Sequence, residues 1–414
     1  MAGTRHHRFR HRQAGRTEDL SGIGCGSRPG QARRSGCTVR NSRNRTPPFT
    51  PGTVQGSPTA ATGRGFWILC AALILWYIAA SESWRLFPPD PAVLAAATVQ
   101  ADAIGAVRAE RIARGIAIDL EYDRNDTGLI GDSYTAMTST QGSLPAKRSA
   151  ATPEAAVLLV RLLRKAGVGP GSIVAVNSSG SFPGFALAAA AACGALQAEP
   201  VIVLSLGSST WGANRSDFTV ADMFQAALDR NVFPPDFKTT IAAVTPGGSD
   251  DRGLDLDHDA LEGALARLVA HGVPVIRPAS LEESVSSRMA LYRHRGEPDV
   301  LLTIGGNYAS TGADPELALI SGVIEPSSSI HVDGTGLVQE FLRSGKPVVQ
   351  VLNVENLFDR YGMTFDPHPL QPAGQGWVYR ELRLPAAILL APAVGALVLY
   401  GIGRRKKGKK EGEV

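Results

Sequence analysis

Residues 173–184 read Ile-Val-Ala-Val-Asn-Ser-Ser-Gly-Ser-Phe-Pro-Gly. The run of β-branched and small apolar residues predicts a buried strand over 173–177. A Gly- and Ser-rich loop follows, and the proline at the start of the Ala-rich stretch 182–196 indicates the first turn of a helix. A strand that turns directly into a helix is the opening half of a βαβ unit, so this stretch predicts an α/β fold.

The same alternation of apolar runs and amphipathic or Ala-rich stretches continues through residues 85–383. Helices are predicted at 91–114, 153–166, 182–196, 220–230, 257–271, 281–295 and 336–344. Strands are predicted at 173–177, 200–206, 239–245, 274–277, 300–304 and 347–352. Strands separated by helices of this length favour a mostly parallel, Rossmann-like sheet in one α/β domain.

Two uncharged hydrophobic segments flank this domain. Residues 66–80 read FWILCAALILWYIAA, and with their polar flanks they predict a transmembrane helix over 65–83. Residues 384–402 read LPAAILLAPAVGALVLYGI and precede a basic tail at 403–414, which is typical of a second spanning helix. The small residues Ala79-Ala80-Ser81 leave a cleaved signal peptide as the alternative for the first segment.

Charge is divided between the ends and the body of the chain. Residues 1–65 carry a net charge of +10 and residues 403–414 carry +4, whereas residues 66–402 carry −10. Because basic flanks stay in the cytoplasm, both termini are predicted to be cytoplasmic and residues 85–383 extracytoplasmic, in a two-pass protein of the cell membrane. The acidic body argues against nucleic acid as a partner. The lipid bilayer is expected to surround both hydrophobic segments.

Residues 1–64 form a basic arm that is rich in Arg, Gly, Ser, Thr and Pro. The arm has almost no apolar periodicity, so it is predicted to be disordered. A start codon assigned too far upstream is the alternative explanation of this composition.

Gly-, Ser- and Asn-rich loops follow most of the predicted strands. In a parallel sheet these loops leave the carboxyl edge, where open α/β sheets bind ligands. The loop after 173–177 also opens a helix, whose free N–H groups and dipole favour a carboxylate or phosphate. The predicted ligand-binding residues are Lys147, Ser178, Ser179, Gly180, Ser181, Ser208, Ser209, Gly305, Gly306 and Asn307.

Two of these positions leave an alternative open. Gly180 is expected to let a ligand approach the backbone, but a glycine there also fits a simple tight turn. Lys147 lies in the long polar stretch 123–148 and supplies a positive charge, although Lys147 and Arg148 equally fit an ordinary solvated pair.

Several kinds of site are not indicated by the sequence. Walker A and GxGxxG patterns are absent, so no nucleotide cofactor is expected, and the four cysteines lack CxxC spacing for a metal. GxSxG is also absent, so catalytic residues stay unassigned. His331-Val332-Asp333 can present a base, but a surface histidine is the simpler interpretation. A buried thiol is expected at Cys193, and a solvated loop followed by an acidic helix start is expected for Asp250, Asp251, Asp255, Asp257 and Asp259.

A set of short segments carries a family resemblance. The segments are TGLIG at 127–131, AKR at 146–148, NSSGSFP at 177–183, SSTWGAN at 208–214, GGN at 305–307 and VLN at 351–353. Taken together, they resemble the poly-gamma-glutamate system protein family over residues 67–402, which includes both anchors and excludes the arm. The resemblance implies a role in making or exporting poly-gamma-glutamate, the anionic cell-surface polymer of some capsules, with the membrane proteins of the synthase or exporter as partners.

Three hypotheses of different classes follow. The first is an accessory component of this machinery whose domain binds a small anionic group. The second is a hydrolase or transferase that acts on the amide bonds of the polymer, and the third is a structural partner of the synthase complex. Since an acidic body repels a long polyanion, the first hypothesis favours a polymer end or a glutamate-like anion as the ligand.

Overall fold

The computed structural model describes residues 61–82, 88–234, 239–312, 314, 316–327 and 333–380, together with the single positions 392 and 395. Residues 1–60 of the predicted arm, the basic tail and His331 lie outside the described residues. Nearly all of the predicted second membrane segment does so as well.

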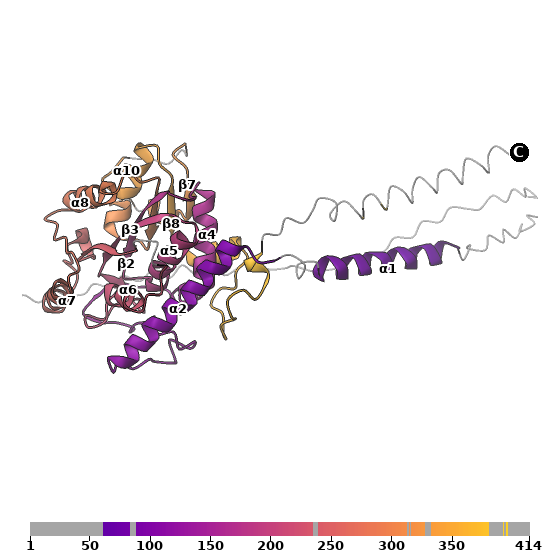
Figure 1. Cartoon of the computed structure of the whole chain (residues 1–414), viewed down its shortest axis with the longest axis horizontal. Coiled ribbons are helices and arrows are strands. Elements are labelled where there is room, and N and C mark those ends of the chain that lie inside the picture. Colours follow the sequence, from indigo (N-terminus) through magenta and orange to yellow (C-terminus); the bar gives the residue numbers. More distant parts are fainter. Residues whose placement is uncertain are drawn as a thin grey trace, which may run out of the picture. The chain divides into compact units, whose positions relative to one another are not determined.

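A six-stranded sheet with the order β5-β3-β2-β6-β8-β7 forms the centre of the domain (Figure 1). All neighbouring strands are parallel except β7, which runs antiparallel to β8. The predicted α/β fold with a mostly parallel sheet is therefore confirmed. The strands are β2 (Ile173–Ser179), β3 (Glu199–Ser205), β5 (Ile241–Thr245), β6 (Val300–Ile304), β7 (Gly322–Ile324) and β8 (Val348–Val351).

Helices cover both faces of this sheet. One face lies under α2 (Pro91–Ala113), α4 (Glu154–Lys165), α5 (Pro183–Ala195), α6 (Val220–Asp229) and α7 (His258–Ala270). The other face lies under α8 (Leu281–Arg293) and α10 (Leu337–Arg343), which Figure 1 shows on the opposite side from α2 and α6.

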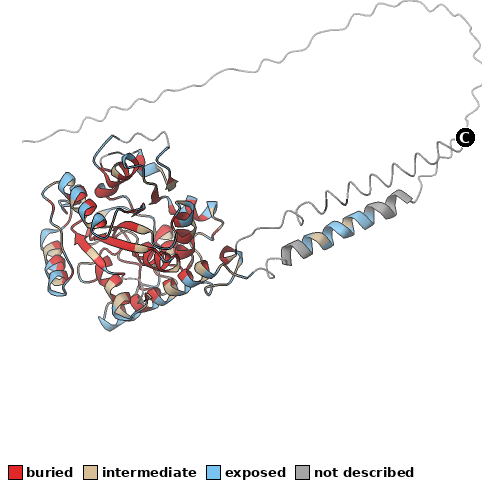
Figure 2. Ribbon diagram, turned by 45° about the horizontal axis from the view of Figure 1, so that its top comes forward, coloured by how far each residue is buried: buried red, intermediate tan, exposed pale blue. Residues whose placement is uncertain are grey.

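Alternate residues of each strand supply the two layers of the core. In β3, Val201 and Val203 pack against the α8 and α10 layer, whereas Ile202 and Leu204 pack against the α2, α4 and α5 layer. A strand that is buried on both faces is apolar at every position, which is why these strands were visible as continuous apolar runs. The central strands are accordingly buried in Figure 2.

Side-chain caps fix the starts of several helices. The Asp90 carboxylate accepts from the first N–H groups of α2, which begins at Pro91. Thr219 and Asp222 form a reciprocal capping box at the start of α6, and Asp257 caps α7. These caps satisfy backbone donors that have no partner inside the helix.

The sequence did not predict the shorter elements. They are α3 (Leu144–Ala150), α9 (Tyr308–Thr311), α11 (Val354–Arg360), the two-stranded sheet of β1 (Thr138–Thr140) and β4 (Ser208–Ser209), β7, and 3-10 turns at Ser249–Asp251, Leu317–Leu319 and Trp377–Tyr379. The strand predicted at 274–277 was wrong, since that stretch forms only an isolated bridge between Val244 and Val275. Elements this short depend on tertiary contacts more than on local pattern.

Two apolar helices bear on the predicted membrane association. Among the described helices, α2 alone is long and apolar enough to cross a membrane, but one of its faces is buried against α4, α5 and α6. The first predicted membrane segment is instead the helix α1 (Ala61–Glu82). Its side chains Trp67, Ile68 and Tyr77 are 72%, 70% and 69% exposed, so they lie outside the core formed by the described residues.

The contact between α5 and α3 gives a test of the fold. A Cβ added to Gly184 would lie 2.1 Å from the carbonyl oxygen of Ala150, and backbone atoms cannot move aside cheaply. Gly184→Ala should therefore destabilise the protein by about 2–3 kcal/mol in thermal unfolding of the full chain in detergent. Gly263→Ala is the matched control on α7, where nothing lies within 4 Å, and it should stabilise the protein slightly. Equal effects of the two substitutions would contradict this packing.

Candidate functional site at the switch point of the sheet

The chain reverses its direction across the sheet at β2. It runs outward from β2 to β3 and β5, and then returns to place β6 on the other side of β2. Loops that follow the two strands at such a switch point diverge, and open α/β sheets bind ligands there. The three loops that the sequence singled out, after β2, β3 and β6, thus leave adjacent strands at one edge.

The three loops are within contact distance of each other. A Cβ added to Gly305, whose φ is +80°, would lie 2.4 Å from Ser179 Oγ. The backbone N–H of Ser209 donates to Ser181 Oγ over 3.0 Å. We call the set formed by Lys147, residues 178–182, residues 208–209 and residues 305–307 the loop junction.

Gly180 has a role different from the expected one. A Cβ at this position would lie 2.8 Å from the carbonyl oxygen of Leu206 and 3.1 Å from Ser208 Cβ. The loop after β3 therefore occupies the space directly next to Gly180. Gly180 is required for close packing of two loops, and we expect a larger residue there to destabilise the fold.

Lys147 reaches the junction from α3 and is only 3% exposed. Its Nζ donates to the carbonyl oxygen of Ser181 and, over 2.6 Å, to Ser209 Oγ. Nζ also lies 3.8 Å from the centre of the Phe182 ring. Among the residues that the structure describes, no carboxylate forms an ion pair with Lys147.

Burial lowers the pKa of Lys147 from 10.5 to about 7. The cause is loss of hydration, which penalises the ammonium more than the neutral amine. Near neutral pH the side chain is therefore present in both forms. The ammonium attracts anions, and the amine has a lone pair that can accept a proton.

Arg148 does not form the solvated pair with Lys147 that the sequence allowed. It makes two hydrogen bonds of 2.7 Å to the carboxylate of Asp366, which Arg124 also contacts. This bidentate pair holds the segment around Asp366 against α3. The two neighbouring basic residues thus differ, because Arg148 pairs with a carboxylate and Lys147 has no such partner among the described residues.

The serine hydroxyls of the junction have different partners. Ser178 and Ser208 donate to the carbonyl oxygens of the residues that follow them, Ser179 and Ser209. Ser209 Oγ is the hydroxyl in direct contact with an amine. The structure therefore gives these serines different hydrogen-bond partners, whereas the sequence could not tell them apart.

A fully buried ion pair lies beneath the junction. Arg288 and Asp251 are both 0% exposed, and Arg288 Nη1 lies 2.6 Å from Asp251 Oδ2. The remaining hydrogen-bonding positions of the pair are taken by the side chains of Asn177, Ser205, Thr245 and Ser284. Such a pair is stable only when its other donors and acceptors are satisfied, as they are here.

Asp251 contradicts the expectation for the acidic run, whereas Asp257 meets it. Asp251 was predicted to lie in a solvated loop but is buried. No local sequence motif predicts Arg288 as its partner. Asp257 was assigned to an acidic helix start, and its carboxylate does cap α7. In the described part of the chain no group of three potential metal ligands occurs.

Asn177 joins the buried pair to the loop after β6. Its Nδ2 donates to Asn307 Oδ1 over 3.1 Å and to Ser310 Oγ over 2.8 Å. Asn307 in turn caps α9 through the Ser310 N–H and donates to Ser205. The side-chain amide of Asn307 is therefore used in hydrogen bonds within the fold. Gly306, in the same loop, is exposed.

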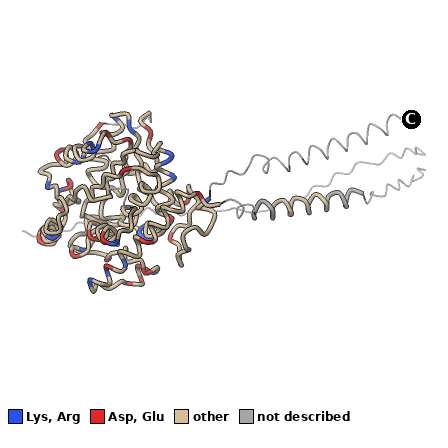
Figure 3. Tube along the Cα trace, viewed as in Figure 1, with Lys and Arg blue, Asp and Glu red and all other residues tan. Residues whose placement is uncertain are grey.

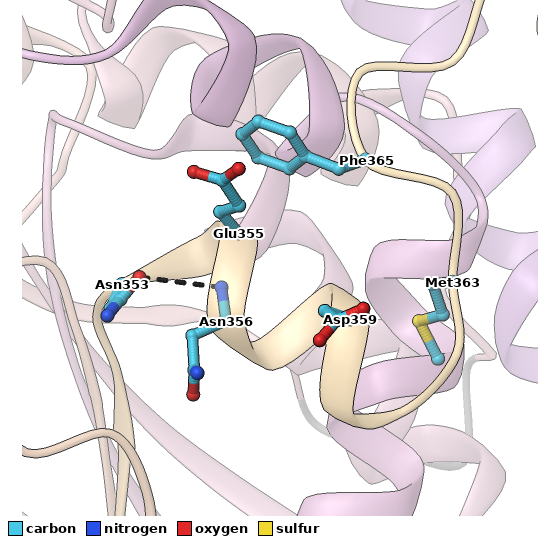
Figure 4. Close-up of a pocket in the computed structure, with 6 residues that line it drawn as sticks. All are labelled: Asn353, Glu355, Asn356, Asp359, Met363 and Phe365. Carbon is cyan, nitrogen blue, oxygen red and sulfur yellow. Dashed lines mark hydrogen bonds between the residues drawn. The ribbon is translucent and has the colours of Figure 1, made fainter. Parts of the chain in front are cut away.

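A separate cavity of about 450 Å³ lies beside the first turn of α11 (Figure 4). It is lined by Asn353, Glu355, Asn356, Asp359, Met363 and Phe365. Figure 4 shows the carboxylates of Glu355 and Asp359 among the described lining residues, none of which is a lysine or arginine. These carboxylates disfavour an anionic ligand, so the cavity does not replace the loop junction as the candidate site.

Comparison with known proteins provides no relative. No family model, no curated protein and no solved structure matches this chain.

The buried amine predicts an unusual dependence of stability on pH. Between pH 7 and 10.5 the unfolded chain keeps a proton on Lys147 that the folded protein has lost, so this group makes stability rise with pH across that window. Lys147→Met should abolish this contribution. It should also stabilise the protein at pH 7 by roughly 1–3 kcal/mol, because relief of desolvation exceeds the two lost hydrogen bonds.

Urea unfolding of the full chain in detergent between pH 6 and 10 measures both effects. Lys165→Met, at an exposed position of α4, is the control and should change stability by less than about 0.5 kcal/mol. An unchanged pH slope in Lys147→Met would show that Lys147 is not a buried amine.

Proposed function

We propose that the protein is a membrane-anchored accessory component of poly-gamma-glutamate synthesis or export. In this proposal its extracytoplasmic domain binds a γ-glutamyl chain end or a glutamate-like anion at the loop junction. The resemblance to the poly-gamma-glutamate system protein family supplies the polymer. The observation that carries the binding site is Lys147, a buried cation without a described carboxylate partner at the switch point.

The surroundings of Lys147 support an anionic ligand. The first turn of α5 begins at Pro183, directly after the β2 loop, and has no side-chain cap. Uncapped N–H groups and the helix dipole attract a carboxylate. Elsewhere charges of both signs are interspersed over the domain (Figure 3), and the body is acidic as a whole, so attraction is local to the junction.

The α1 helix supports the membrane part of the proposal. Its exposed Trp, Ile, Leu and Tyr side chains suit lipid better than water. Together with the apolar segment at 384–402 and its basic tail, α1 favours a two-pass arrangement with both termini in the cytoplasm. The expected partners in the membrane are then the synthase or export proteins.

Binding can be measured with a defined oligomer. We expect penta-γ-glutamate to bind the full chain in detergent, with an affinity that weakens as the pH rises from 6 to 8.5. The carboxylates stay ionised over this range while Lys147 loses its proton, since its pKa is about 7. Lys147→Met should weaken binding at pH 6 about tenfold, which corresponds to about 1.4 kcal/mol.

Calorimetric titration gives these affinities, with Lys165→Met as the control that should bind like the wild type. Undetectable binding, or equal binding by Lys147→Met at every pH, would contradict the proposal.

Topology can be tested with single cysteines in a chain whose native cysteines are replaced. Ser286 is exposed on α8, so Ser286→Cys should react with an impermeant maleimide in intact cells. Lys409→Cys in the basic tail should react only after the cells are opened. The reverse pattern would place the domain in the cytoplasm and exclude the proposed location.

A further inference from the structure

Ser209 and Lys147 form a hydroxyl–amine pair that anion binding does not require. Their side chains are 5% and 3% exposed, and Lys147 Nζ lies 2.6 Å from Ser209 Oγ. A nucleophilic hydroxyl needs a base within this distance to take its proton. A lysine that serves only to hold charge would be expected to lie near an acidic side chain. No such partner of Lys147 is found among the described residues.

The main chain orients the lysine for this task. Lys147 Nζ donates one hydrogen to the carbonyl oxygen of Ser181. A neutral amine held in this way can turn its lone pair toward the Ser209 hydroxyl and accept its hydrogen. The carbonyl thus takes the part that an acidic side chain takes when it orients a histidine base.

The loop that carries Ser181 leads into the start of a helix. Ser181 lies beside the pair, because its Oγ accepts from the Ser209 N–H over 3.0 Å, and it is only half-buried. Two residues further on, α5 begins without a side-chain cap. Backbone N–H groups at such a helix start can stabilise the negative oxygen of a tetrahedral intermediate.

We propose that Ser209 is a nucleophile activated by Lys147, and that the domain cleaves or transfers a γ-glutamyl amide bond at the loop junction. The assignment of the nucleophile rests on the contact between Lys147 Nζ and Ser209 Oγ. The identity of the acyl group as γ-glutamyl rests on the proposed function.

The reaction passes through an ester on Ser209. Ser209 Oγ bonds to the amide carbonyl carbon while its proton moves to Lys147 Nζ. The tetrahedral intermediate then breaks its C–N bond, and Lys147 returns the proton to the leaving amine, which leaves an ester on Ser209. Water releases the acid from this ester, or a second amine forms a new amide. In either case Lys147 takes the proton of the attacking group and gives it to Ser209 Oγ.

The same lysine makes binding and chemistry respond to pH in opposite directions. Anion binding uses the ammonium and weakens as the pH rises through about 7. Activation of Ser209 uses the amine and strengthens through the same range. An uncharged reagent that reports only the nucleophile therefore separates the two proposals.

The test is labelling of the full chain in detergent with an uncharged fluorophosphonate that carries a fluorophore. Ser209 Oγ should displace fluoride from phosphorus, and peptide mapping should locate the label at Ser209. The rate should rise about tenfold per pH unit below pH 7 and level off above it. Ser209→Ala should abolish labelling. Lys147→Met should slow labelling at least 100-fold while thermal unfolding shows that it stays folded, and the exposed control Ser286→Ala should react at the wild-type rate.

The outcomes distinguish the two proposals. Labelling of another serine, or labelling of Lys147→Met at the wild-type rate, would overturn the assignment of the pair. Absence of label in a protein that binds penta-γ-glutamate would overturn the nucleophile and leave the binding function. Label at Ser209 without oligomer binding would keep the nucleophile and remove poly-gamma-glutamate as its ligand. Shorter oligomers or new amides after incubation with penta-γ-glutamate, seen by mass spectrometry and lost in Ser209→Ala, would support both.

Discussion

The pairing of β2 with a parallel neighbour on each side is the constraint on which the candidate site depends. Register with β3 places Ser179 beside Ser205, and register with β6 places Asn177 beside Thr303. These polar strand ends are buried, which would be costly if they lacked partners. The Arg288–Asp251 pair and Asn307 supply partners to Asn177 and Ser205, Ser310 supplies one to Thr303, and Ser179 Oγ donates to the carbonyl oxygen of Ile304. The loops that leave the three strands are consequently held at one edge, above a buried hydrogen-bonded network.

Lys147 is the one member of the junction whose placement opposes stability. A buried amine that is not paired with a carboxylate loses hydration, and two hydrogen bonds return only part of that loss. Groups of this kind are typical of functional sites, where pKa values near neutral pH suit proton transfer. Its neighbour Arg148 shows the contrast, because its bidentate bond to Asp366 is a structural pair. Adjacent basic residues in a sequence can thus have unrelated roles.

Local pattern predicted the elements that are long and periodic. The strands β2, β3, β5, β6 and β8 and the helices α2 and α4 to α8 follow from buried apolar runs, helical periodicity and caps. The neighbouring loops of the site also follow, because the predicted parallel sheet places them at one edge. Local pattern does not predict the burial of Lys147, its bond to Ser209 or the pairing of Asp251 with Arg288. Each of these depends on residues that are distant in sequence and meet only in the folded protein. The close packing at Gly180 could not be predicted either, because the loop that lies against it follows another strand.

The central claim is that a lysine at the switch point titrates near neutral pH in contact with a serine hydroxyl. NMR of the protein with ¹³C-labelled lysine ε carbons measures this titration directly. We predict one lysine signal with a midpoint near pH 7 that is missing in Lys147→Met, and whose position shifts in Ser209→Ala because the hydroxyl is lost. If every lysine signal of the folded wild type instead titrates near the ordinary pKa of about 10.4, the buried amine does not exist and the account of the site is wrong.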